Sequence, residues 1–191
     1  MAKKENPFIG KKASFVKQLF GAACEAGRAF DLNPAMILAQ AAIETGWGES
    51  GYAKRGNNYF GIIACGKPNA YWKGAKSSVN ANGLCFRKYA MPTDSFMDYG
   101  RLLRAQYSRA ADKSYFPAAF AQEMSYSAYI SEKNGDNREH YRKMLISIEA
   151  DIRDIVAEHG LDLPFDNDAN VDTESDVECN LFWNEEDQVS A

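Results

Sequence analysis

The stretch that decides the fold is residues 33–50, "NPAMILAQAAIETGWGES". Asn33 is a residue that commonly caps a helix N-terminus, and Pro34 suits the first helical position. The mostly apolar segment that follows extends to Gly46, where a glycine can end a helix. The sequence therefore predicts a largely apolar helix from Pro34 to the residue before Gly46.

One acidic side chain shares a face with the apolar residues of this helix. By the 3.6-residue period, Glu44 lies on the same side as Ile37 and Ala41, so we expect it to be partly buried. Burial and the negative end of the helix dipole both favour a protonated carboxyl group, which could then act as a general acid. A structural, hydrogen-bonded glutamate is the alternative.

The residues after Glu44 are typical of a tight exit from a helix. Gly46 and Gly48 carry no Cβ atom, so the chain can turn sharply and leave space above Glu44 for a substrate. Trp47 could supply a flat wall for a sugar ring, or it could simply fill the core. The residues alone therefore leave two interpretations open, a substrate site and a structural helix end.

Helical periodicity recurs along most of the remaining chain. Apolar residues three and four positions apart predict helices in residues 12–30, 93–107 and 137–159, with a short helix near 116–124. Gly160 is a natural end for the last of these helices. The chain is therefore expected to be mostly α-helical.

The middle of the chain has a different composition. Residues 59–64, "YFGIIA", and 83–90, "GLCFRKYA", are typical of strands, and residues 80–83, "NANG", are typical of a turn. A small sheet or β-hairpin lobe is the expected result. The predicted fold class is therefore α+β, mostly α, with one helical domain and one small β-hairpin lobe.

Length and charge divide the chain into a body and a tail. The 191 residues, 46% of them hydrophobic, suffice for one substantial core, expected in residues 1–160. Residues 1–159 hold all 22 Lys and Arg against 16 Asp and Glu, whereas residues 160–191 hold 10 acidic and no basic residues. We expect residues 161–191 to form an acidic, flexible tail that could bind a partner.

Targeting and metal signals are not apparent in the sequence. No stretch reaches the ~18 apolar residues needed to cross a bilayer, and the basic start is not followed by an apolar segment of a signal peptide. The four cysteines show no zinc-binding spacing, so neither a metal nor a cofactor is expected. Cys65 and Cys85 flank the predicted lobe and could form a disulfide in an oxidising compartment, or remain free thiols.

Several motifs in order resemble one known family. Residues 33–50 followed by "GNNYFGI" (56–62), then "YWKG" (71–74), "CFRKYAMPTDSFMDYGRLL" (85–103) and "SAYISEKNGDNREHYRKML" (127–145), are similar to glycoside hydrolase family 73, which includes the hydrolase domain of the flagellar rod-cap protein. The resemblance covers about residues 12–150. It implies a lysozyme-like fold that cleaves the β-1,4 bond between N-acetylglucosamine and N-acetylmuramic acid in peptidoglycan.

The resemblance also implies roles for individual residues. Glu44 matches the catalytic acid of the family, and Tyr129 matches its active-site tyrosine, although the residues after Tyr129 depart from the family motif. Asn58, Tyr59 and Phe60 match the segment that lines the sugar cleft, which Trp47 is also expected to shape.

The second carboxylate of a two-carboxylate glycosidase is not obvious, because residues 64–91 contain no Asp or Glu. Asp98 matches an acidic position of the family and is the first candidate, with Glu49 and Asp94 as alternatives. Participation of the acetamido group of the substrate would remove the need for this residue. Asp94 could instead be a helix-cap residue, and Glu49 a solvated charge.

The expected function is therefore a peptidoglycan endo-β-N-acetylglucosaminidase that binds glycan strands. A muramidase or a lytic transglycosylase on the same fold is one rival, and a non-catalytic cell-wall binding or assembly protein is another. The positive body would also fit nucleic acid, but no nucleic-acid motif supports this partner. Without a visible signal peptide, we expect delivery to the periplasm or cell wall by a specialised route, for example as an antibacterial effector whose acidic tail binds an export carrier or an inhibitor protein.

Overall fold

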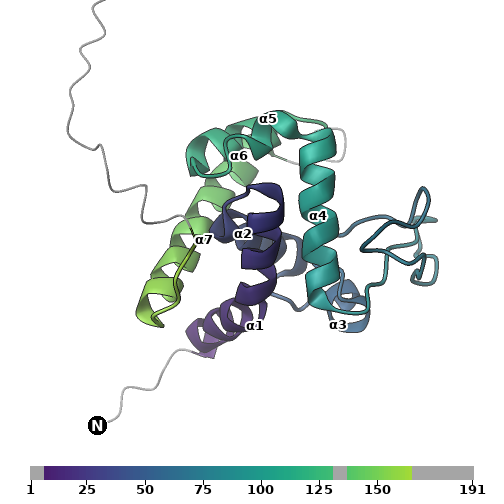
Figure 1. Cartoon of the computed structure of the whole chain (residues 1–191), viewed down its shortest axis with the longest axis horizontal. Helices are drawn as coiled ribbons and strands as arrows, with labels where there is room; N and C mark the ends of the chain where they lie inside the picture. The colour runs from purple at the N-terminus through teal and green to yellow at the C-terminus, as the bar shows by residue number, and fades with distance from the viewer. Residues whose placement is uncertain (1–6, 131–136, 165–191) are drawn as a thin grey trace, which may run out of the picture.

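The computed structural model describes residues 7–130 and 137–164, which contain seven helices (Figure 1). The longest helices form the body of the molecule, and three short ones join them. In chain order they are α1 (Pro7–Phe30), α2 (Pro34–Thr45), α3 (Gly51–Gly56), α4 (Pro92–Gln106), α5 (Ser108–Ala111), α6 (Pro117–Ser125) and α7 (Arg138–Glu158).

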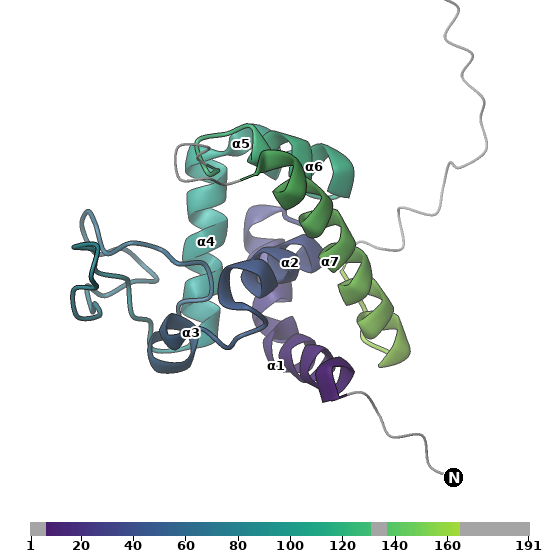
Figure 2. The ribbon, with the colours of Figure 1, turned by 180° about the vertical axis from the view of Figure 1, so that it is seen from behind.

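The helix predicted from the opening stretch is α2, and it lies at the centre of the body, with α1, α4 and α7 around it in both ribbon views (Figure 2). Ten of its twelve residues are buried, which explains why this segment is apolar on almost every side. Asn33 Oδ1 accepts a hydrogen bond from the Ala35 amide at 2.9 Å, and Gly46 ends the helix with φ +58°. The predicted capping signals are therefore confirmed.

The other predicted helices are also confirmed, with small shifts of their ends. The first begins at Pro7 rather than near residue 12, and the last ends at Glu158, followed by Gly160 with φ +60°. Leu163 is buried beyond that glycine, so the packed part of the chain continues past the predicted boundary at residue 160. The remainder of the predicted acidic tail, residues 165–191, lies outside the described residues.

Residues 57–91, here called the lobe, project beyond α4 at the right of Figure 1. The prediction of strands is wrong for the described residues: the lobe has only two isolated antiparallel bridges, Ile63 with Phe86 and Lys76 with Arg87. The turn at 80–83 forms, since the Gly83 amide donates to the Asn80 carbonyl at 3.0 Å.

The remaining architecture is that of a helical core. The helices α1 and α4 pack closely together, and Gly100 of α4 lies so near the Phe30 ring that a Cβ atom at Gly100 would be 2.5 Å from it. None of the described helices is both long and apolar enough to cross a membrane. The fold thus consists of a helical body, with the lobe attached to one side.

Candidate active site

A cavity of about 900 Å³ opens over the last turn of α2. Its walls come from the lobe, the second half of α4, residues 128–130 and the first turns of α7. Cavities of this size accept ligands of several rings. Glu44 is the only carboxylate among the lining residues that the structure describes.

Glu44 is exposed in this cavity, which corrects the expectation that it is partly buried. Ile37 and Ala41, on the same helical face, are buried. The last turn of α2, however, reaches the cavity, and the Glu44 carboxylate is exposed there. Gly46 then takes the chain away in a left-handed conformation. Gly61 of the lobe lies beside the carboxylate, since a Cβ atom there would be 3.9 Å from Glu44 Oε2.

Tyr129 contacts Glu44 across a long separation in the chain. Its hydroxyl group donates a hydrogen bond to Glu44 Oε1 at 2.8 Å. Its ring lies against Tyr107 and Tyr141, with ring centroids 5.7 and 6.4 Å away. Burial first, and then the negative charge of Glu44, raise the pKa of Tyr129 well above its ordinary value, so the hydroxyl remains a donor.

A second polar contact lies deeper, one helical turn before Glu44. Gln40 is fully buried on α2, and its Nε2 donates to the Tyr141 hydroxyl oxygen at 2.9 Å. Burial and then the charge of Glu44 raise the pKa of Tyr141, although the hydrogen bond from Gln40 opposes them. Sequence reasoning gave no site role to Gln40 or Tyr99, and Tyr107 and Tyr141 lay in segments that resemble the family but received no role. The one local signal for Gln40 was a lone glutamine among apolar residues.

The predicted cleft segment 58–60 is only partly in the cavity. Phe60 lines it, and its ring stacks on Tyr99 with centroids 4.0 Å apart. Asn58 is buried and has a structural position, because its Nδ2 donates to the carbonyls of Ile62 at 2.9 Å and Arg87 at 3.0 Å. Asn58 therefore shapes the lobe without lining the cavity.

Trp47 and Tyr59 do not line the cavity either. The Trp47 ring packs edge-on against Phe15 of α1 with centroids 5.5 Å apart, and Lys12 Nζ lies 4.9 Å from its centre. Tyr59 also packs on Phe15, at 6.4 Å. Because Trp47 has φ +63°, the turn after α2 carries its ring to α1. The structure therefore places these two rings against α1 and not in the cavity that contains Glu44.

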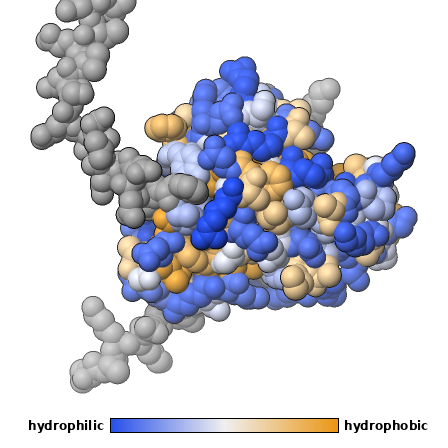
Figure 3. All heavy atoms as spheres, in the orientation of Figure 1, coloured by the Kyte–Doolittle hydropathy of each residue, from blue (hydrophilic) through white to orange (hydrophobic). Residues whose placement is uncertain are grey.

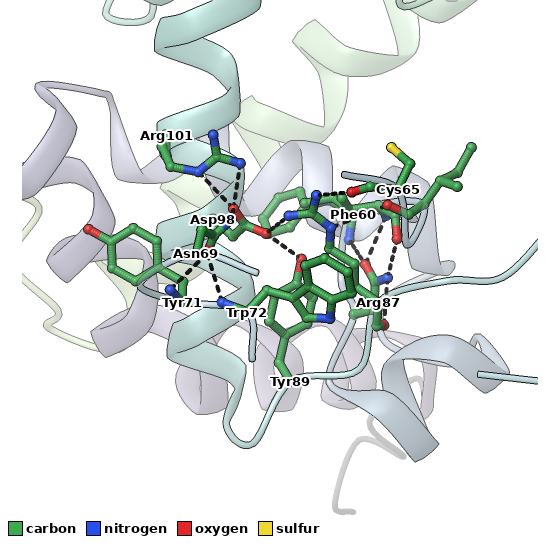
Figure 4. A network of polar contacts seen from close by, with 12 residues as sticks. Phe60, Cys65, Asn69, Tyr71, Trp72, Arg87, Tyr89, Asp98 and Arg101 are labelled. Carbon is green, nitrogen blue, oxygen red and sulfur yellow. Dashed lines mark hydrogen bonds and ion pairs between the residues drawn. The ribbon is translucent and has the colours of Figure 1, made fainter. Parts of the chain in front are cut away.

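Asp98, the first candidate for a second carboxylate, is fully buried and absent from the cavity lining (Figure 4). Its Oδ2 accepts hydrogen bonds from Arg87 and Tyr89, and its Oδ1 accepts from Arg101 and Asn69. Burial alone would raise the pKa of Asp98, but these hydrogen bonds and the charge of Arg87 outweigh it and hold the pKa below the usual value. Asp98 therefore fastens the lobe to α4.

The two alternatives also lie outside the cavity. Glu49 is exposed and forms ion pairs with Lys54 at 2.6 Å and Lys11 at 3.1 Å, and hydrogen bonds from these lysines lower its pKa. Asp94 Oδ2 accepts a hydrogen bond from the Met91 amide at 3.2 Å, which satisfies a free backbone donor at the start of α4.

Of the two alternatives for Cys65 and Cys85, a disulfide or free thiols, the structure has free thiols. Cys65 is exposed on the cavity wall, Cys85 is partly buried, and Cys24 is buried in the body. Cys179 lies outside the described residues. Within residues 7–130 and 137–164, no three His, Cys, Asp or Glu side chains gather where they could hold a metal ion.

A helical body with an attached lobe, and a carboxylate at a helix end in an open cavity beside a tyrosine donor, defines a lysozyme-like domain. The family model for glucosaminidases, described as mannosyl-glycoprotein endo-beta-N-acetylglucosaminidase, matches residues 21–154, more than half of the chain. The chain belongs to this family, glycoside hydrolase family 73. The family predicted from the sequence motifs is thereby confirmed.

Relatives and solved structures agree with this assignment. The peptidoglycan hydrolase FlgJ of Vibrio parahaemolyticus is 36% identical over 103 residues, which cover 47% of this chain and 32% of that protein, so the match spans about a third of the relative's length. In fold, the chain is similar to the glycoside hydrolase domain of FlgJ from Salmonella typhimurium, with TM-score 0.59 and 23% identity over 78% of this chain and 92% of that one. A type VI secretion system effector–immunity complex from Pseudomonas protegens gives TM-score 0.58 and 21% identity over 77% and 94% of the two chains.

Proposed function

We propose that this protein is an endo-acting β-N-acetylglucosaminidase that cleaves the β-1,4 bond between N-acetylglucosamine and N-acetylmuramic acid in peptidoglycan. The observation that carries the proposal is the Glu44 carboxyl group, exposed in a cavity of about 900 Å³ and hydrogen-bonded by Tyr129. The matched relative, described as a peptidoglycan hydrolase, supports this choice of substrate.

In the proposed mechanism, Glu44 donates a proton to the glycosidic oxygen as the bond to the anomeric carbon breaks. Tyr129 orients the carboxyl group through its hydrogen bond to Oε1. The raised pKa of Tyr129 keeps its hydroxyl group protonated at neutral pH, so that it remains a donor. Glu44 is therefore the proton donor, and Tyr129 is a positioning residue.

Displacement at the anomeric carbon does not need a second protein carboxylate. No described residue of the cavity lining except Glu44 carries one. We propose that the acetamido carbonyl oxygen of the substrate attacks the anomeric carbon as the glycosidic bond breaks and Glu44 protonates the leaving oxygen. Water then opens the cyclic intermediate and gives its proton to the Glu44 carboxylate. The same observation favours one rival reaction, transglycosylation, in which the 6-hydroxyl group of a muramic acid residue attacks its own anomeric carbon and leaves a 1,6-anhydro sugar.

The test is digestion of purified sacculi with the wild-type protein and with Glu44→Gln. Borohydride reduction followed by mass spectrometry identifies the sugar at each new reducing end. Loss of a general acid typically lowers the rate about 10²- to 10⁴-fold, and this is the expected result for Glu44→Gln. Glu49→Gln is the matched control, because Glu49 lies outside the cavity on an exposed surface, and it should retain wild-type activity.

Each possible product has a clear meaning. Reduced N-acetylglucosamine released by wild type but not by Glu44→Gln supports the proposal. Reduced muramic acid would indicate a muramidase, and an anhydro sugar would indicate a lytic transglycosylase. Binding to sacculi without any released sugar would indicate a non-catalytic wall-binding protein.

We further propose that the protein acts in the periplasm or cell wall after delivery by a specialised route, as an antibacterial effector. The similarity in fold to a structure of an effector–immunity complex supports this proposal. Residues 161–191, which hold 10 acidic and no basic residues, would bind the export carrier or the inhibitor protein. A chain that lacks residues 165–191 should keep its activity in vitro and lose delivery; unchanged delivery would contradict this role.

A further inference from the structure

The charges of the body are unevenly distributed. Residues 50–93, here called the basic segment, comprise α3, the lobe and the first residues of α4, and contain no Asp or Glu. The segment carries seven basic residues: Lys54, Arg55, Lys67, Lys73, Lys76, Arg87 and Lys88. Hydrophilic side chains project from the lobe at the right of Figure 3.

Most of this positive charge is not neutralised by neighbouring carboxylates. Lys54 pairs with Glu49, and Arg87 pairs with Asp98. The other five basic residues are exposed and form no ion pair with any residue that the structure describes: Arg55, Lys67, Lys73, Lys76 and Lys88. An exposed surface with five unneutralised cations attracts anionic groups.

The unneutralised cations lie next to the proposed active site. Lys67 is part of the wall of the cavity that contains Glu44. Arg55 and Lys88 line a second cavity, of about 470 Å³, together with Ser77 and Ser78. Arg87 lines both cavities, so the two cavities adjoin at this residue. A polymer that lies over Glu44 and extends past Arg87 would reach this positive surface.

We propose that the basic segment is a docking surface for the carboxylate groups of the peptide stems of peptidoglycan, anchored by Arg55 and Lys88. This inference rests on the proposed function. Peptide stems leave the glycan strand at every muramic acid residue and carry free carboxylates, so stems beside the cleaved bond extend outward over the rim of the cavity. The guanidinium group of Arg55 can hold a carboxylate with two parallel hydrogen bonds, and the hydroxyl groups of Ser77 and Ser78 add neutral donors.

The experiment compares two charge-reversed proteins of equal net charge. Arg55→Glu/Lys88→Glu changes the anchor, and Lys17→Glu/Arg28→Glu changes two exposed basic residues of α1 outside the basic segment. Both pairs are made in the Glu44→Gln protein, so that binding is measured without turnover. The probes are sacculi cleared of attached polymers, and glycan strands from which an amidase has removed the stems.

The expected result is a loss of affinity that depends on the stems. Arg55→Glu/Lys88→Glu should bind intact sacculi at least about tenfold more weakly than the control pair at low salt, and the difference should shrink as salt screens the charges. Both proteins should bind stem-free strands equally. Equal binding of both proteins to intact sacculi would overturn the proposal, and so would an equal loss on stem-free strands.

A third probe separates carboxylates from phosphates. Teichoic acid, a phosphodiester polymer without stems, should compete weakly for binding of intact sacculi. Teichoic acid could instead compete as strongly as an equal concentration of peptide stems, and that competition could disappear in the Arg55→Glu/Lys88→Glu protein. This result would overturn the assignment and identify a phosphate polymer as the ligand. Thermal melting should show both charge-reversed proteins folded, because all four substituted side chains are exposed.

Turnover by the corresponding variants that keep Glu44 separates this inference from the proposed function. Arg55→Glu/Lys88→Glu should cleave stem-free strands at the wild-type rate and show a raised KM with unchanged kcat only on intact sacculi. If neither the wild-type protein nor any variant releases sugar from either material, the proposed function fails. The binding comparison would still show whether the basic segment binds the stems.

Discussion

The hydrogen bond between Tyr129 and Glu44 joins residues 85 positions apart, within the cavity. The helix-capping signals placed Glu44 at a helix end, but it was the similarity to the family that singled it out as the acid. The exposure of Glu44 was not predictable, since the helical period gives the face on which a residue lies but not how far the neighbouring elements cover that face. Trp47 and Tyr59 pack on Phe15 of α1 rather than in the cavity, and the sequence carries no signal for the side on which such a ring packs.

Removing the Tyr129 hydroxyl group should impair turnover without unfolding the protein. In Tyr129→Phe, the ring can still pack on Tyr107 and Tyr141, but Glu44 loses a donor. A hydrogen bond to a charged group contributes about 1.5–3 kcal/mol, so kcat should fall about 10- to 100-fold with little change in KM. Steady-state kinetics on sacculi provide the measurement, and Tyr126→Phe, at an exposed ring that does not line the Glu44 cavity, is the control. An unchanged kcat would exclude a positioning role for Tyr129.

At the scale of single elements, the helices were predictable and the lobe was not. Caps and apolar periodicity lie within each helix segment, so α2, α4, α6 and α7 follow from the sequence. In the lobe, asparagine side chains form hydrogen bonds with backbone amides that could otherwise pair in a sheet. Asn69 Oδ1 accepts from the amides of Tyr71 and Trp72, and Asn80 Oδ1 accepts from two amides of its own turn. Such local bonds compete with a strand ladder, and strand-like composition does not reveal them.

The glycine that ends α2 offers a test of this element. Gly46 has φ +58°, and a Cβ atom placed on it would lie in open space, so Gly46→Ala adds backbone strain without a clash. A left-handed residue with a Cβ atom costs about 1–2 kcal/mol, and the free energy of unfolding should fall by that amount. Gly21→Ala, in the exposed middle of α1 with equally open space, should instead raise it by about 0.5–1 kcal/mol. Urea denaturation measures the change in the free energy of unfolding for each variant. If both substitutions changed it in the same direction, the role given to Gly46 at the helix end would be refuted.

At the scale of the whole molecule, one buried carboxylate holds the lobe on the helical body. Asp98 on α4 accepts hydrogen bonds from Asn69, Arg87 and Tyr89 of the lobe. Sequence similarity made Asp98 the first candidate for the second carboxylate, but it could not distinguish a carboxylate that faces substrate from one that faces arginine. The difference depends on where Arg87 packs, which only the folded lobe determines.

Asp98→Asn should destabilise the protein in a pH-dependent way. The variant leaves the buried Arg87 guanidinium without its anionic partner, and loss of such a pair costs about 3 kcal/mol. Because the pKa of Asp98 is lowered on folding, its contribution is complete above the unfolded-state value of about 3.9 and is lost as the pH falls through the folded-state pKa. The stability difference between wild type and variant should therefore be largest at pH 7 and shrink below about pH 4.

Urea denaturation at several pH values checks this prediction. Asp151→Asn is the control, because Asp151 forms a more exposed ion pair with Lys12 at 2.6 Å and should change stability by less than about 1 kcal/mol. A difference for Asp98→Asn that stays constant down to about pH 3 would show that the ionised carboxylate is not what fastens the lobe.

The free thiol of Cys65 has a consequence for chemical intervention. It is exposed on the wall of the same cavity as Glu44, whereas Cys24 is buried. An electrophile that alkylates Cys65 would place a permanent group in this cavity, where the proposed glycan substrate would bind. The protein thus carries its own attachment point for a covalent inhibitor, or for a fluorophore whose emission reports when the cavity is occupied.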